Sequence, residues 1–158
     1  MIKTIIFDWK RTLYDPDTKS LIDGVLDLLE FIKSKGVPMI LIGKGADEMH
    51  EEVDRLEVRR YFKNIVFAEG EKDINVFKGF VSTNPKETVF VGDRVRSELE
   101  IGNKLGATTI WVKQGRFADE EPQNGQQKPD YTVSSLHECK RQLKSYFLAA
   151  NVVNLGNG

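Results

Sequence analysis

The stretch Thr4-Ile5-Ile6-Phe7-Asp8-Trp9-Lys10-Arg11-Thr12-Leu13 places a short apolar run directly before an aspartate. Such a run is typical of a buried parallel strand, whose C-terminal end presents polar side chains at a ligand-binding crevice. Val89-Phe90-Val91-Gly92-Asp93 repeats the pattern far downstream. Two such strands side by side would bring Asp8 and Asp93 together. This pairing suggests a Mg²⁺ site with an aspartate nucleophile.

Strand-like and helix-like segments alternate along the whole chain. The expected strands are Thr4–Phe7, Val37–Ile42, Ile65–Phe67, Thr88–Val91 and Thr108–Val112, with Tyr131–Val133 as a candidate edge strand. The expected helices are Asp23–Ser34, Ala46–Leu56, Ile74–Val81, Val95–Leu105 and a last one from Ser135 to about Phe147. This alternation predicts an α/β fold: a single three-layer, Rossmann-like domain with a parallel five-stranded sheet and helices on both faces. We expect the domain to cover residues 1–147 and residues 148–158 to form a flexible C-terminal tail.

The composition fits an ordinary globular protein of 158 residues with a net charge of −1. This charge gives no indication of nucleic-acid binding or of an anionic membrane surface. The single cysteine, Cys139, excludes an internal disulfide and favours a reducing compartment. The chain has no apolar run of about 20 residues and no basic and apolar leader at its N-terminus. We therefore expect a cytoplasmic protein.

In these motifs the chain resembles the haloacid dehalogenase (HAD) superfamily, most of whose members are Mg²⁺-dependent phosphatases. The resemblance covers roughly residues 2–136. Phe7–Leu13 is similar to the first motif, Asp-x-Asp-x-Thr-Leu, with Lys10 in the position of the second aspartate. Val91–Glu98 is similar to the fourth motif, a Gly-Asp pair followed by another acid. Lys72 lies about twenty residues before Asp93, where the family carries its lysine, and Lys78 is a weaker candidate.

The resemblance implies a role for each matching residue. Asp8 would attack phosphorus and form an aspartyl-phosphate, and Lys72 would offset its charge and contact the phosphate. Asp8, Asp93 and the backbone carbonyl of Lys10 would hold Mg²⁺ as the cofactor. Glu98 would lie outside the direct ligands of the metal and would orient Lys72 or a metal-bound water. Thr12 would anchor the turn so that backbone amides face the phosphate.

Two positions depart from the family pattern. The family's second aspartate protonates the leaving group and then activates water, and here that residue is Lys10. Loss of a general acid/base costs about 10²–10⁴-fold in rate, and an ammonium at this place is better suited to holding an anion. The second motif normally ends in Ser or Thr, whereas Ile40–Gly43 ends in glycine. We expect Gly43 and Lys44 to bind phosphate, with backbone amides of Gly43-Lys44-Gly45 as the donors.

Neither usual insertion point has room for a cap domain, so the chain is similar to the cap-less members of the family. An open site suits a phosphorylated macromolecule as well as a phosphorylated small molecule, or closure by a second subunit in a homo-oligomer. Residues 114–130 form a polar loop that serves as a partial lid or as a plain surface connection.

Three functions remain open. The leading hypothesis is a weak or unusually specific Mg²⁺-dependent phosphomonoesterase that acts through Asp8. The alternative is a catalytically impaired member of the fold that binds a phosphorylated ligand or partner in a regulatory role. A phospho-acceptor signalling module ranks lowest, because such modules cluster their acids at the start of the chain and Asp93 and Glu98 come late.

Overall fold

The computed structural model describes residues 1–156, with side chains described through residue 148. Its centre is one sheet of six strands in the order β5-β4-β1-β6-β7-β8, and every neighbouring pair is parallel. The strands are β1 (Thr4–Phe7), β4 (Met39–Lys44), β5 (Asn64–Ala68), β6 (Thr88–Gly92), β7 (Thr108–Val112) and β8 (Tyr131–Val133). The predicted parallel sheet is confirmed, and the candidate edge strand is its sixth member.

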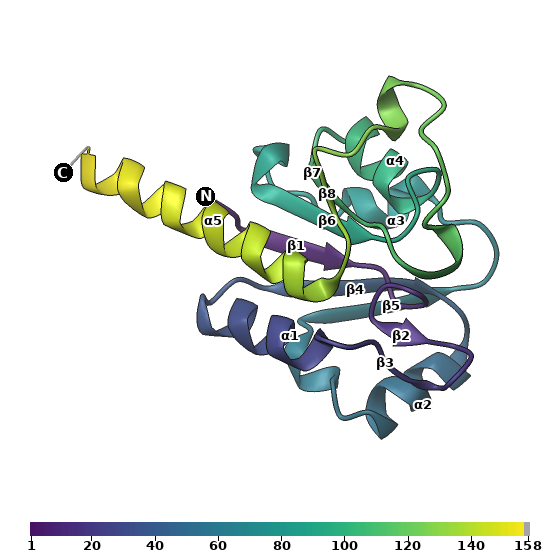
Figure 1. Ribbon diagram of the computed structural model, residues 1–158. Helices are drawn as coiled ribbons and strands as arrows, with labels where there is room; N and C mark the ends of the chain where they lie inside the picture. Colours follow the sequence, from purple (N-terminus) through teal and green to yellow (C-terminus); the bar gives the residue numbers. More distant parts are fainter. Residues whose placement is uncertain (157–158) are drawn as a thin grey trace.

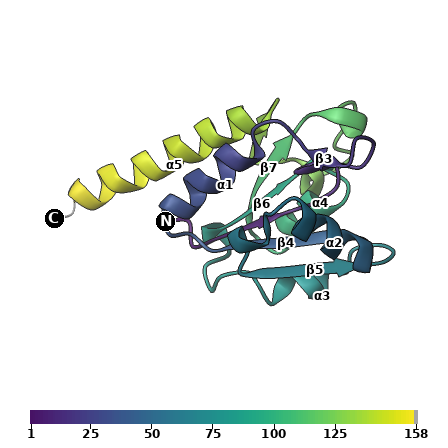
Figure 2. The same ribbon diagram turned by 90° about the horizontal axis from the view of Figure 1, so that it is seen from below.

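Helices cover both faces of the sheet, as expected from its apolar strands (Figure 1). The helices are α1 (Val25–Ser34), α2 (Asp47–Arg55), α3 (Ile74–Lys78), α4 (Glu98–Lys104) and α5 (Leu136–Gly156), with 3₁₀ turns at Arg59–Tyr61, Pro85–Glu87, Gly115–Phe117 and Gly125–Gln127. The helices α1, α2 and α5 contribute to one hydrophobic core, and α3 and α4 contribute to the other. Figures 1 and 2 show α5 running alongside α1 and extending beyond the sheet.

The first strand occupies the middle of the sheet and sets the position of the site. Its Phe7 pairs with Leu41 of β4 on one side and with Val91 of β6 on the other. Alternate side chains of β1 enter opposite cores, because Ile5 and Phe7 belong to one core and Ile6 to the other. The C-terminal ends of β1, β4 and β6 therefore meet at one edge of the sheet.

Two segments differ from the predicted pattern near this edge. The connection after β1 contains a small hairpin of β2 (Tyr14–Asp15) and β3 (Ser20–Leu21), and the Tyr14 hydroxyl donates a 2.7 Å hydrogen bond to Glu52 of α2. The helix α4 begins three residues later than predicted. Residues 94–97 form a turn instead, because the Glu98 carboxylate accepts a hydrogen bond from the Arg94 amide at 3.2 Å.

The last helix runs to Gly156, beyond its predicted end near Phe147. The expected flexibility of residues 148–158 stays a prediction, and residues 157–158 lie outside the described part of the chain. The two places where a cap domain would be inserted hold only the β2–β3 hairpin and the short segment 69–73 in the described chain, which agrees with the cap-less prediction. None of the helices described in residues 1–156 combines the length and the apolar character needed to cross a membrane.

Candidate active site

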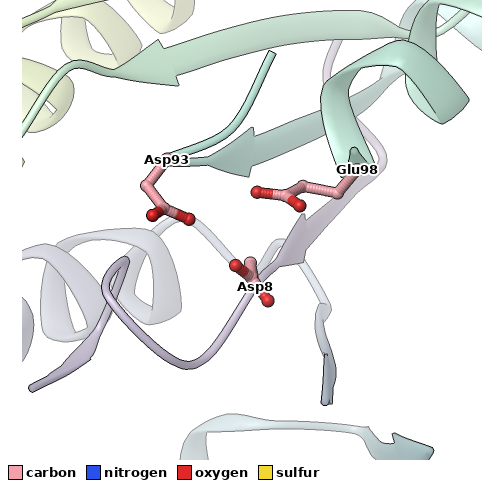
Figure 3. Close-up of side chains that lie close together, drawn as sticks. All are labelled: Asp8, Asp93 and Glu98. Carbon is pink, nitrogen blue, oxygen red and sulfur yellow. The ribbon is translucent and has the colours of Figure 1, made fainter. Parts of the chain in front are cut away.

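Three buried carboxylates converge at the C-terminal edge of the central strands (Figure 3). Asp8 follows β1, Asp93 follows β6, and Glu98 is the first residue of α4. Each contributes an oxygen atom that lies within 4.8 Å of the oxygens of the other two. The parallel register of β1 and β6 brings the two aspartates together, as the sequence predicts.

One lysine compensates part of this negative charge. Lys72 lies between β5 and α3, and its Nζ is 2.5 Å from Oδ1 of Asp8 and 3.5 Å from Oε2 of Glu98. Burial opposes the charge of Lys72, but the two carboxylates outweigh that effect and raise its pKa above the ordinary value. Lys72 is therefore an ammonium in direct contact with Asp8, as expected from its position in the sequence.

Thr12 connects the two aspartates. Its hydroxyl oxygen lies 3.2 Å from Oδ1 of Asp93 and 3.4 Å from Oδ2 of Asp8. The indole of Trp111 donates a 2.9 Å hydrogen bond to the Asp93 carbonyl, and the Gln114 amide donates to the Thr12 carbonyl at 3.3 Å. These contacts fix the loops that carry the carboxylates. Thr12 therefore positions side chains of the cluster, and its predicted contact with phosphate stays a prediction.

Glycine at position 92 allows Glu98 to reach the cluster. A Cβ atom at Gly92 would lie 2.6 Å from Cγ and 2.8 Å from Cδ of Glu98, closer than real Cβ contacts occur. The Gly-Asp pair of the downstream motif thus has a steric reason: the aspartate is a member of the cluster, and the glycine leaves space for a second acid. Glu98 contacts Lys72 directly and also stands beside both aspartates.

The cluster holds more negative charge than its neighbours compensate. Burial, followed by the charges of Glu98 and Asp8, raises the pKa of Asp93 to about 9. Burial and the charge of Asp8 likewise raise the pKa of Glu98. The Oδ2 atom of Asp93 is buried and has no hydrogen-bond partner among the described residues. Close carboxylate oxygens with one unsatisfied atom are the ligands that a hard divalent cation such as Mg²⁺ requires.

The cluster opens into a cavity of about 580 Å³, which both Lys10 and Lys44 line. Gly43, in contrast, is not among the residues that line it. A Cβ atom at position 43 would lie 2.8 Å from Cβ of Trp9 and 2.8 Å from the Phe67 ring. Trp9 is itself fully buried, with its ring 5.1 Å from that of Tyr14. The packing of Trp9 and Phe67 against Gly43 therefore excludes the Ser or Thr side chain in which the second motif normally ends.

Several residues of the cavity were not predicted. They include four cationic residues, namely Arg11, Arg94, Arg96 and Lys104, together with the ring of Phe117 and the acids Glu71 and Glu100. Arg11 and Arg94 lie next to predicted residues in sequence, so their proximity to the motifs was a usable signal. Lys104 had no such signal, because only the position of α4 brings it to the cavity.

The loop of residues 114–130 is attached to the site at several points. The Glu120 carboxylate accepts hydrogen bonds from the Arg94 guanidinium at 3.0 Å and from the Arg96 amide at 3.0 Å. The guanidinium carbon of Arg94 lies 4.2 Å from the centre of the Phe117 ring, and Phe117 also lines the cavity. These contacts place the loop at the rim of the site, as a partial lid requires. Its movement as a lid stays a prediction.

Comparison with known proteins points to one family. A family model described as HAD-hydrolase-like matches residues 41–139. Glyceraldehyde 3-phosphate phosphatase of Methanopyrus kandleri is 26% identical over 125 residues, which cover 72% of this chain and 52% of that protein. The protein of the same name from Methanocaldococcus jannaschii is 29% identical over 115 residues, covering 68% and 49% of the two chains. The chain thus spans about half the length of these curated relatives.

Solved structures show the same fold over nearly the whole chain. D,D-heptose 1,7-bisphosphate phosphatase of B. bronchiseptica, complexed with magnesium and phosphate, has a TM-score of 0.71 at 16% identity and covers 92% of this chain and 99% of its own. The enzyme of the same name from Burkholderia thailandensis gives a TM-score of 0.70 at 16% identity, with coverage of 90% and 99%. At these identities the likeness concerns the fold.

Proposed function

This chain belongs to the HAD-hydrolase-like family, and from that premise we propose that it is a Mg²⁺-dependent phosphomonoesterase with Asp8 as its nucleophile. One observation carries the proposal. The buried Asp8 carboxylate lines the cavity, contacts an ammonium at 2.5 Å and stands beside two further carboxylates. The curated relatives are named as phosphatases, which supports the same class of reaction.

The contacts of Asp8 suit the attack of a carboxylate on a phosphate ester. Lys72 holds Oδ1, and Thr12 contacts Oδ2 at 3.4 Å, so the carboxylate is fixed in one orientation before the substrate arrives. The attack forms a bond between Asp8 and phosphorus and breaks the bond to the leaving oxygen, which takes a proton from solvent water. Water then hydrolyses the aspartyl-phosphate, which releases inorganic phosphate and restores the Asp8 carboxylate. Lys72 offsets negative charge on Asp8 and on the phosphoryl oxygens throughout these steps.

The chain's own carboxylates fit a magnesium ion. We propose that Asp8, Asp93 and the backbone carbonyl of Lys10 hold it, with Glu98 in support. The unsatisfied Oδ2 atom of Asp93 supports this assignment. When bound, Mg²⁺ neutralises charge between the carboxylates and on the phosphate. Asp93 would then remain ionised, because a bound cation favours the deprotonated form of its ligands.

Lys10 determines how fast the reaction runs. It lines the cavity but has no carboxyl group with which to protonate a leaving group or to activate water. We therefore propose a slow enzyme that acts on a phosphorylated small molecule or macromolecule in the cytoplasm.

A second function is favoured by the same lysine. Because Lys10 makes no ion pair with any side chain in the described part of the chain, it is free to hold an anion. A protein with the family's phosphate site and an ammonium in place of the general acid would bind a phosphorylated ligand or partner without turning it over.

Phosphatase assays on a panel of phosphomonoesters with Mg²⁺ separate these two functions. We expect weak hydrolysis by the native chain, its loss in Asp8→Asn, and an increase of about 10²-fold or more in Lys10→Asp. The matched control is Lys63→Met, an exposed lysine next to the first residue of β5, at the opposite end of that strand from the site. Hydrolysis that persists in Asp8→Asn would contradict the nucleophile. Absence of native activity, with activity gained in Lys10→Asp, would favour the binding role.

A further inference from the structure

The cations of the cavity fall into two groups. Most of those that line it have a partner within the protein. Lys72 contacts Asp8, Arg94 contacts Glu120, and Lys104 lies 3.6 Å from Glu100, while Arg96 donates a 2.8 Å hydrogen bond to a carbonyl of the 114–130 loop. The exceptions are Lys10, Arg11 and Lys44, which form no ion pair with any residue that the structure describes. We call these three residues the cation cluster.

The topology brings the cation cluster to one place. Lys10 and Arg11 come two and three residues after Asp8, in the turn that follows β1, and Lys44 is the last residue of β4. Because β1 and β4 are neighbours in the sheet and run parallel, their C-terminal ends lie at the same edge. All three residues line the cavity that also contains Asp8 and Lys72. The cation cluster is thus adjacent to the proposed phosphate site and is separate from the Asp8–Lys72 pair.

Arg11 is held in place by an unusual backbone conformation. Its φ of 64° lies in the left-handed region, which only three non-glycine residues adopt in the described chain. The turn is stabilised by a 2.6 Å hydrogen bond from the Arg11 amide to the Tyr14 carbonyl, and Gln114 donates to the Arg11 carbonyl at 3.4 Å. The guanidinium also lies 5.9 Å from the centre of the Phe117 ring. Contacts that stabilise a costly conformation are typical of residues with a functional position.

The remaining acids of the cavity do not neutralise these charges. Asp8, Asp93 and Glu98 belong to the carboxylate cluster around Lys72, and Glu100 is paired with Lys104. Only Glu71 remains, against Lys10, Arg11 and Lys44, which have no ion pair, and Arg96, whose guanidinium contacts only a backbone carbonyl. An anionic group bound in this part of the cavity would gain attraction from several cations at once. Lys10 and Arg11 are half-buried and Lys44 is exposed, so the attraction is strongest near the first two residues.

We propose that the cation cluster of Lys10, Arg11 and Lys44 binds a second anionic group of the substrate, beside the phosphate that reacts at Asp8. The substrate class is then a phosphate monoester that carries a further phosphate or a carboxylate. This inference rests on the proposed function, because that function assigns the first phosphate to Asp8 and Lys72. It also gives Lys10 a role as a specificity-determining residue in the position where a general acid is missing.

Equilibrium binding tests the cation cluster without requiring turnover. The full-length chain with Asp8→Asn, in the presence of MgCl2, is titrated calorimetrically with glycerol 3-phosphate, 3-phosphoglycerate and 2,3-bisphosphoglycerate. The first two compounds differ by a carboxylate in place of a hydroxymethyl group, and the third adds a second phosphate. We expect the additional anion to tighten binding by at least about fivefold. The carboxylate and phosphate arms show which anion the cation cluster prefers.

Substitutions then test the three residues. Lys10→Met, Arg11→Met and Lys44→Met, each added to Asp8→Asn, should reduce the ratio of the affinities for 3-phosphoglycerate or 2,3-bisphosphoglycerate to the affinity for glycerol 3-phosphate by roughly three- to tenfold. Lys63→Met and Arg141→Met are the matched controls, because both residues are exposed and neither lines the cavity. Their ratio should not change.

The outcomes separate this inference from the proposed function. Equal affinity for all three compounds, no measurable binding of any of them, or a ratio that the cation-cluster substitutions leave unchanged would overturn the inference, even if the native chain is a phosphatase. A ratio that depends on these residues in a chain without Asp8-dependent hydrolysis would support the inference and contradict the catalytic proposal.

Discussion

Asp93→Asn should make the metal-free protein more stable. Asp93 is 2% exposed, and its pKa is raised from 3.8 to about 9 by burial and by the charges of Glu98 and Asp8. At pH 7 the folded chain therefore holds a proton on Asp93 that the unfolded chain releases. Holding that proton costs about 4 kcal/mol at pH 7 and about 2 kcal/mol at pH 5. An asparagine requires no proton, and its Oδ1 can still accept from Thr12.

The expected gain is smaller than this cost, because the buried amide retains part of the desolvation penalty. We expect about 1–3 kcal/mol at pH 7, a rise in Tm of roughly 2–12 °C for a chain of this size. The sign of the pH dependence follows from proton binding. Native stability should fall as pH rises from about 4 to about 9, because the folded state binds more protons in this window. The Asp93→Asn variant should lose most of that slope.

Magnesium should narrow or reverse the difference in stability between the native chain and Asp93→Asn. A cation at 100 times its Kd stabilises the native chain by about 2.7 kcal/mol, and we expect Asp93→Asn to lose most of this gain. Thermal unfolding by calorimetry, in EDTA and in a MgCl2 series from pH 5 to pH 8.5, measures both effects. The control is Asp119→Asn, which changes an exposed aspartate. A lower Tm of Asp93→Asn in EDTA would refute the electrostatic reasoning, and an undiminished magnesium response would refute the role of Asp93 as a ligand.

Two further substitutions test the charge compensation and the steric space around the carboxylate cluster. Lys72→Met should destabilise the chain by about 3–5 kcal/mol in EDTA at pH 8, because buried Asp8 loses the ammonium that it contacts; a Tm within about 2 °C of the native value would count against this. Gly92→Ala should cost about 1–3 kcal/mol in urea unfolding, because its Cβ would displace Glu98. Gly79→Ala, at helical angles and in open space, should instead gain roughly 0.4–1 kcal/mol, and equal effects at both glycines would contradict the steric argument.

The sheet and the carboxylate cluster could be predicted from the sequence because their signals are local. An apolar run followed by an aspartate indicates a buried strand with a carboxylate at its C-terminal end. Asp8 and Asp93 were therefore identified by the same pattern. Glu98 and Lys72 were assigned from the resemblance of the surrounding sequence to the HAD motifs. The parallel register of β1 and β6 then brings the two aspartates together, whereas Glu98 reaches them only because Gly92 leaves space for its side chain.

The remaining features depend on packing between distant segments. Trp9 and Phe67 exclude a side chain at Gly43, and nothing in the sequence near Gly43 shows this contact. The absence of an ion pair for Arg11 likewise depends on where every acid of the fold lies. The hairpin after β1 was missed because its strands have two residues each, too short for a periodic pattern.

The central position of β1 makes the order of synthesis important. Phe7 finds its partner Val91 only after the segment from α1 to α3 and then β6 have been made, and Asp8 meets Asp93 at the same stage. Until then, β1 of the nascent chain has no partner strand on the side that β6 later occupies. An apolar strand with an unpaired edge is prone to pair with the wrong strand. A nascent chain that stops before residue 93 would carry Asp8, the proposed nucleophile, without its partner carboxylate. The carboxylate cluster would therefore assemble only once β6 has been made and has paired with β1.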